Sequence, residues 1–162
     1  MDQTHIHLLI THLPIFGSIL GAIVLGYGLW AKSTHTIIAA YVVLIISSIG
    51  AVISYVTGEA AEETVENIQG IGKTMVDQHE DFALFALIAL ILLGLVSLVG
   101  LFLNLRKSSL TTTVALVACI ISLIAFGLVA RTGYLGGQIR HTEISTSSGS
   151  PGLNMGGQNN EE

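Results

Sequence analysis

The chain has 162 residues, of which 51% are hydrophobic and only 10% are charged, and its formal net charge is −5. A soluble domain carries about 25% charged residues, so this composition argues against a soluble protein and indicates an integral membrane protein. The acidic balance and the absence of a basic patch exclude nucleic-acid binding.

Four apolar segments are each long enough to cross a bilayer core of about 30 Å, which takes roughly 20 helical residues. They are predicted as membrane spans at about 13–31, 36–57, 82–105 and 110–130. Short connections make successive spans antiparallel neighbours in contact with lipid. The sequence therefore predicts an all-α fold, a four-transmembrane-helix antiparallel bundle with up-down-up-down topology.

The first span contains a Gly-x-x-x-Gly pair, Gly17 and Gly21. Small residues at this spacing let helix backbones approach closely. We expect the pair to pack inside the bundle, and a homodimer formed through it is the alternative.

The connection Gly58 to Gln78 is predicted to contain a short acidic helix, Ala60 to Ile68, before the third helix begins near Thr74. The membrane domain is expected to cover residues 1–143. Residues 144–162 are rich in Ser, Gly, Asn and Gln, a composition that predicts a disordered polar tail.

The basic residues predict the orientation in the membrane, because Lys and Arg near span ends are retained in the cytoplasm. Three lie on each side, but one side packs its three, Lys32, Arg106 and Lys107, into two short turns without acids. This density places both termini outside the cytoplasm. The expected location is the inner membrane of a bacterium, with the termini on the periplasmic side.

Five of the six histidines lie on the predicted outer side: His5, His7, His12, His79 and His141. At about 1.5 Å per residue, His12, His79, Glu59 and Arg131 all lie roughly 30 to 40 Å above the cytoplasmic turns, and Tyr134 lies one turn above Arg131. These groups are therefore expected to converge at the outer rim. The alternative is that each one faces water or headgroups, as polar residues at a membrane boundary commonly do.

Several segments carry a family resemblance: His7-Leu-Leu-Ile-Thr-His12-Leu-Pro14-Ile-Phe-Gly17, Thr57-Gly-Glu59-Ala-Ala-Glu62-Glu63, His79-Glu80-Asp-Phe-Ala83 and Leu135-Gly-Gly-Gln-Ile-Arg140-His141-Thr-Glu143-Ile. The chain resembles a group of uncharacterised bacterial four-helix membrane proteins. Related membrane proteins are thought to hold a b-type haem, so the resemblance implies the same fold and a haem as the expected cofactor.

The histidines independently favour a metal cofactor, because imidazole is the commonest metal ligand and a b-type haem is held by axial side chains alone. No Cys-x-x-Cys-His motif for covalent haem attachment is present. We predict His12 and His79 as the axial pair, with His7 or His141 forming a second site or replacing one of them. Arg131 and Arg140 are expected to pair with the propionates, and Tyr134 is assigned to the same site.

A bare transition-metal ion is the closest alternative. His7, His12, His79 and His141 with Glu59 and Glu80 would suit Zn²⁺, Cu²⁺ or Fe. Its weakness is that His7 and His12 are five residues apart, about 140° around a regular helix, so they converge only if the chain bends.

Three function classes follow from these readings. The first is an electron carrier that exchanges electrons with a redox partner, and the second is a metal-handling protein. The third is a subunit of a membrane complex that docks its partner through the outer loop. An enzyme is not favoured, because no nucleophile with a base and no phosphate-binding loop is present.

Overall fold

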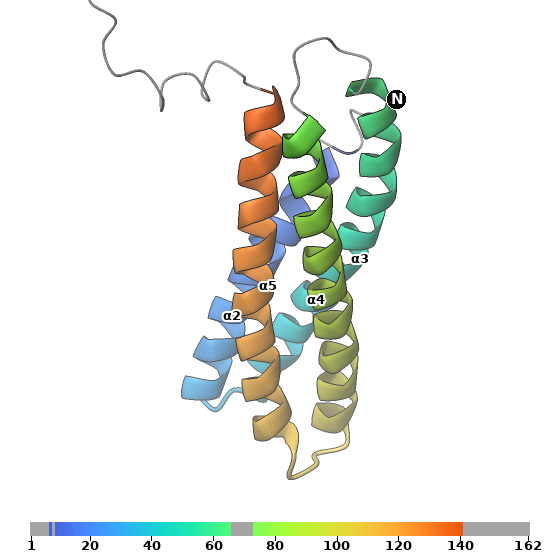
Figure 1. Ribbon diagram of the computed structural model, residues 1–162. Helices are drawn as coiled ribbons and strands as arrows, with labels where there is room; N and C mark the ends of the chain where they lie inside the picture. Colours follow the sequence, from blue (N-terminus) through green and yellow to red (C-terminus); the bar gives the residue numbers. More distant parts are fainter. Residues whose placement is uncertain (1–6, 8, 66–72, 141–162) are drawn as a thin grey trace, which may run out of the picture.

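The computed structural model describes residues 7, 9–65 and 73–140, which form helices and short turns without any strand. The long helices are α2 (His12–Trp30), α3 (Thr34–Val65), α4 (Lys73–Leu105) and α5 (Thr111–Arg140). Each packs against the next along the chain, and α5 closes the bundle against α2 (Figure 1). The predicted all-α four-helix bundle is confirmed.

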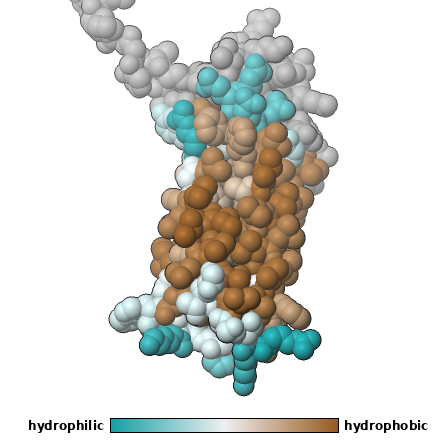
Figure 2. All heavy atoms as spheres, turned by 60° about the horizontal axis from the view of Figure 1, so that its bottom comes forward, coloured by the Kyte–Doolittle hydropathy of each residue, from teal (hydrophilic) through white to brown (hydrophobic). Residues whose placement is uncertain are grey.

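All four helices contain a stretch that is long and apolar enough to span a membrane, at His12–Trp30, Thr34–Gly58, Asp77–Leu105 and Thr111–Gly137. Large apolar side chains on their outward faces are exposed, among them Leu20, Ile88 and Ile120. On the face shown in Figure 2, this apolar surface fills the middle of the bundle, and polar residues lie at both ends. Since water would strongly disfavour such a surface, the chain is an integral membrane protein in contact with lipid.

Helix α3 is longer than the sequence predicted. It does not end at Thr57 but continues through Gly58 to Val65, so no separate helix begins at Ala60. The residues after Gly58, which are Glu59-Ala60-Ala61-Glu62-Glu63, are all strong helix formers. Helix α5 likewise continues through Gly136 and Gly137. Residues 66–72 of the connection and the predicted tail lie outside the described residues.

The glycines of α2 bring it close to α3. A Cβ atom at Gly17 would lie only 2.7 Å from Ser47 Cβ, and one at Gly21 would overlap the Leu44 side chain. Leu44 is fully buried. The prediction that this pair packs inside the bundle is confirmed.

The bundle consists of two helical hairpins, α2–α3 and α4–α5, whose turns share one geometry. Lys32 and Lys107 are the non-glycine residues with positive φ in the described chain, at 51° and 53°. In each turn the amide after the lysine donates to a carbonyl five residues earlier. Ser33 N–H donates to Gly28 O at 2.9 Å, and Ser108 N–H donates to Leu103 O at 3.0 Å. This is the hydrogen bond of a Schellman motif. We call this end of the bundle the lysine end, and the opposite end, which holds His7 and His79, the histidine end.

Two buried serines link the hairpins. Ser48 Oγ on α3 donates to Leu90 O on α4 at 2.7 Å, and Ser122 Oγ on α5 donates to Ser18 O on α2, also at 2.7 Å. Each seam between hairpins therefore carries a serine-to-carbonyl hydrogen bond inside the span, where small polar side chains commonly join helices.

Candidate functional site

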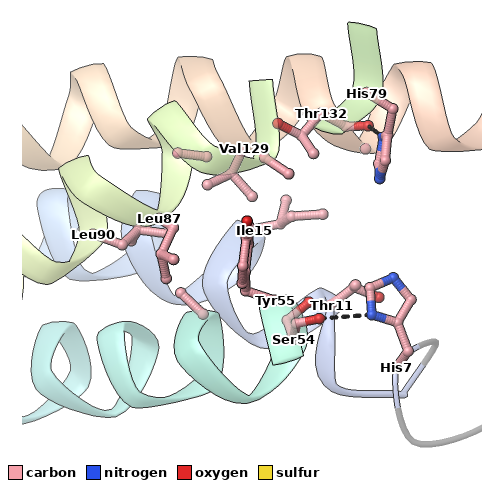
Figure 3. Close-up of a pocket in the computed structure, with 14 residues that line it drawn as sticks. His7, Thr11, Ile15, Ser54, Tyr55, His79, Leu87, Leu90, Val129 and Thr132 are labelled. Carbon is pink, nitrogen blue, oxygen red and sulfur yellow. Dashed lines mark hydrogen bonds between the residues drawn. The ribbon is translucent and has the colours of Figure 1, made fainter. Parts of the chain in front are cut away.

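A pocket opens between the helices at the histidine end, with a cavity of about 90 Å³. Apolar and small side chains supply most of its wall, including Ala51, Ala83, Ala86, Leu87 and Leu90. Tyr55 extends into it from α3, and His7 and His79 lie at one end (Figure 3). The pocket is therefore an apolar chamber with two imidazoles as its titratable groups beside the Tyr55 phenol.

His7 lies on a helical turn that leads into α2, since Thr11 N–H donates to His7 O at 2.9 Å. Its ring is half-buried, and Nδ1 lies 2.8 Å from Ser54 O on α3. A carbonyl oxygen only accepts, so His7 Nδ1 carries the proton and donates it. The Nε2 atom of the neutral ring is then left with its lone pair.

His79 repeats this arrangement from the other hairpin. Its half-buried ring lies on α4, and Nδ1 donates to Thr132 O on α5 at 3.0 Å. The same argument leaves Nε2 of the neutral ring as the acceptor.

The two imidazoles face each other across the end of the pocket. Figure 3 shows the nitrogen of each ring that is not bonded to a carbonyl pointing toward the opposite ring. The geometry thus directs two Nε2 lone pairs, fixed by hydrogen bonds on the far side of each ring, toward a common space.

A glycine lies against each ring. A Cβ atom at Gly58 would be 3.0 Å from His7 Cε1, and one at Gly136 would be 3.0 Å from His79 Cε1. Both values are shorter than ordinary van der Waals contact. The imidazoles therefore occupy space that any larger residue would partly fill.

His12 lies elsewhere. Its side chain is exposed and stacks on Phe16, with ring centroids 6.3 Å apart and an interplanar angle of 16°. Because the turn holding His7 continues into α2, five residues of helix rotate His12 away from the side on which His7 enters the pocket. The structure thus brings His79 together with His7, and it does not bring His12 into the pocket.

The other predicted site residues lie at the rim or outside the description. Arg131 is exposed, with its guanidinium 5.7 Å from the Phe82 ring centroid and 5.5 Å from that of Tyr134. Glu80 is exposed and does not line the pocket. His141 and the side chains of Glu59 and Arg140 lie outside what the structure describes.

Within the described residues, no group of three or more His, Cys, Asp or Glu side chains could hold a metal ion. The described donor set is a pair of imidazoles. Such a pair suits the two axial positions of a haem better than a bare ion, which usually takes four or more protein or water ligands.

Sequence reasoning missed Ser54, Thr132, Gly58 and Gly136 as parts of the site. A signal was present, because Ser54 precedes Gly58 by four residues and Thr132 precedes Gly136 by four residues. Residues four apart lie on one helix face. In each pair the first residue therefore provides a carbonyl acceptor, and the glycine, which has no side chain, leaves space for the imidazole ring.

Comparison of the chain with protein-family models, with curated proteins and with solved structures finds no match.

Proposed function

We propose that this integral membrane protein binds a b-type haem between His7 and His79 and carries electrons. One observation supports this most. Two imidazoles from different hairpins face each other, and the Nδ1–H group of each donates a hydrogen bond to a backbone carbonyl. This is the tautomer that an axial ligand needs, because the metal bonds to Nε2.

The chemistry of the pocket wall suits a porphyrin. Ala51, Ala83, Ala86 and Gly133 are small, and the larger lining groups Leu87 and Leu90 are apolar. Pockets for ligands of this size measure about 300–1,000 Å³, which exceeds the cavity of about 90 Å³. Haem binding therefore requires the helices to separate at the histidine end.

The protein's own groups have distinct roles in this proposal. His7 and His79 would hold the iron, while Ser54 O and Thr132 O keep their tautomers and raise the basicity of Nε2. The apolar wall limits water around the macrocycle. Arg131 at the rim offers a cation for the propionates, and Arg140 is proposed for the same role. A bis-imidazole haem supplies one-electron transfer without covalent attachment.

The choice of ligands differs from the pair predicted from the sequence. His79 is kept, but His7 replaces His12, because the His12 side chain is exposed and stacked on Phe16.

We further propose that the histidine end faces the periplasm of a bacterium. The basic residues Lys32, Arg106 and Lys107 all lie at the lysine end and favour the cytoplasm.

The test is an absorption spectrum of the detergent-purified protein, supplied with haem, before and after reduction with dithionite. A Soret band that shifts and sharpens on reduction, with separate α and β bands, is expected of a six-coordinate b-type haem. A featureless spectrum from folded protein would overturn the proposal. Metal analysis of the same sample would then test the bare-ion alternative, for which the Nε2 lone pairs of His7 and His79 are the available donors.

A further inference from the structure

We infer that the site consists of two equivalent half-sites, one from each hairpin, in which Gly58 and Gly136 act as positioning residues that fix the planes of the His7 and His79 rings. The inference deepens the proposed function and rests on it for the identity of the ligand. The geometry of the rings themselves does not depend on that identity.

The register of the two hairpins supports their equivalence. His7 precedes Lys32 by 25 residues and His79 precedes Lys107 by 28, while Gly58 follows Lys32 by 26 and Gly136 follows Lys107 by 29. Both arms of the second hairpin are thus longer by three residues, slightly less than one helical turn. The lysines in the two turns have similar positive φ angles, 51° and 53°, so the two hairpins share one turn geometry and differ in length by the same amount in both arms.

Two contacts of each ring match as well, although Thr57 Oγ1 also lies 3.4 Å from His7 Nδ1. In each half-site the ring donates to the carbonyl of the residue four positions before the glycine, and its Cε1 atom lies beside that glycine. One helix face thus provides both the carbonyl acceptor and the space beside the glycine that the ring occupies. The two seams between hairpins also match, because each carries one serine-to-carbonyl hydrogen bond.

The glycines restrict how each ring can turn. The hydrogen bond to the carbonyl fixes Nδ1, so the remaining freedom is a tilt of the ring about that bond. A Cβ at Gly58 or Gly136 would press on Cε1 from a distance of 3.0 Å and tilt the ring. By contrast, no described atom lies within 4 Å of a Cβ built at Gly137, next to Gly136 on the same helix. Gly137 is thus a matched control.

The tilt has a chemical consequence, since the orientation of an axial imidazole is one of the properties through which a protein tunes a haem. Two equivalent glycines should therefore affect the haem alike, although they lie in different hairpins. A residue with a merely structural role would change stability without changing the ligand field.

The first experiment compares Gly58→Ala, Gly136→Ala and Gly137→Ala in the full-length protein loaded with haem b. We expect Gly58→Ala and Gly136→Ala each to shift the low-spin g values of the oxidised haem and its midpoint potential. Gly137→Ala should match the wild type. Unchanged g values and potential in both test variants would overturn the inference.

A second measurement uses the protein without haem, in detergent, with ¹⁵N-labelled histidine. We expect Gly58→Ala to shift the ring signals of His7, Gly136→Ala to shift those of His79, and Gly137→Ala to shift neither. If the wild type binds no haem, the proposed function fails, while these signals still decide the half-site inference. Unmoved ring signals in both test variants would reject it.

A double variant separates ring contact from general damage to the helix. If Gly136→Ala lowers the Tm because its Cβ presses on His79, the decrease should be smaller in a His79→Ala background, where the ring is absent. In that background the decrease in Tm should equal the one caused by Gly137→Ala. A cost that persists in the His79→Ala background would contradict the proposed contact.

Discussion

His7 and His79 approach each other from different hairpins and are anchored in the same way, each through Nδ1 to a carbonyl on the second helix of its own hairpin. Each ring is therefore oriented within its hairpin, and packing of the two hairpins brings the rings together. The packing of the two hairpins thus determines how the two rings are placed relative to each other.

The ligand assignment predicts different effects for the three histidines. His7→Ala and His79→Ala should each abolish the six-coordinate haem spectrum, because each removes one Nε2 donor. His12→Ala should keep it, because His12 stacks on Phe16 outside the pocket. Reduced-minus-oxidised spectra of the three variants check this, with membrane insertion measured alongside. Loss of haem in His12→Ala with retention in His7→Ala would restore the pair predicted from the sequence.

The bundle was predictable from the sequence because long apolar segments with short turns allow few other arrangements. Helix ends were less predictable. Thr57-Gly58 predicts the end of a helix, yet Gly58 is helical and lies beside the His7 ring. This is a tertiary contact, which local helix propensity cannot predict.

The site could be predicted only in part. His79 and His7 were among the candidates, but choosing His7 over His12 required knowing that the turn before α2 is helical, which fixes the side each ring faces. The carbonyls of Ser54 and Thr132 were invisible to residue-type reasoning, because every residue has a carbonyl. A comparison of the two hairpins, offset by the three residues by which the arms of the second are longer, would have aligned them.

The α2–α3 contact predicts sensitivity at Gly21. Gly21→Ala should destabilise the protein by about 1–3 kcal/mol, the usual cost of overpacking, because its Cβ would overlap Leu44. Thermal unfolding in detergent measures the change. Gly26→Ala on the same helix is the control, since no described atom lies within 4 Å of a Cβ there. Equal stability of the two variants would show that α2 and α3 pack less closely than described.

Replacing either of the two serines that link the hairpins should lower the free energy of unfolding by a small and similar amount. Ser48→Ala and Ser122→Ala should each cost about 0.6 kcal/mol, the average for interhelical hydrogen bonds in membranes. The two hydrogen bonds lie on opposite seams and share no residue, so the double variant should show a nearly additive loss. Ser18→Ala serves as a control, because Ser18 Oγ bonds to Pro14 O and Ile15 O of its own helix. Unfolding in detergent compares them, and a cost at Ser18 equal to that at Ser122 would contradict the assigned role of the seams.

Haem should stabilise the folded bundle, since a ligand that binds only the folded state adds about 2.7 kcal/mol at a free concentration of 100 Kd. We expect the Tm of the wild type to rise with haem concentration. The Tm of a His7→Ala/His79→Ala double variant should stay constant, because the axial donors are gone. A similar rise in both proteins would mean that haem partitions into the detergent or binds elsewhere.

Arg131 should strengthen haem binding modestly. It lies at the rim of the histidine end, exposed and stacked over Phe82 and Tyr134, so an ion pair with a propionate would be solvated and worth about 0.2–1 kcal/mol. Arg131→Gln should therefore weaken haem binding roughly 1.5-fold to 5-fold at low ionic strength, and by less in high salt because ions screen the pair. Arg106→Gln is the matched control, since Arg106 stacks on Phe102 in the same manner at the lysine end. Titration of the Soret absorbance with haem measures both, and equal effects of the two substitutions would remove Arg131 from the site.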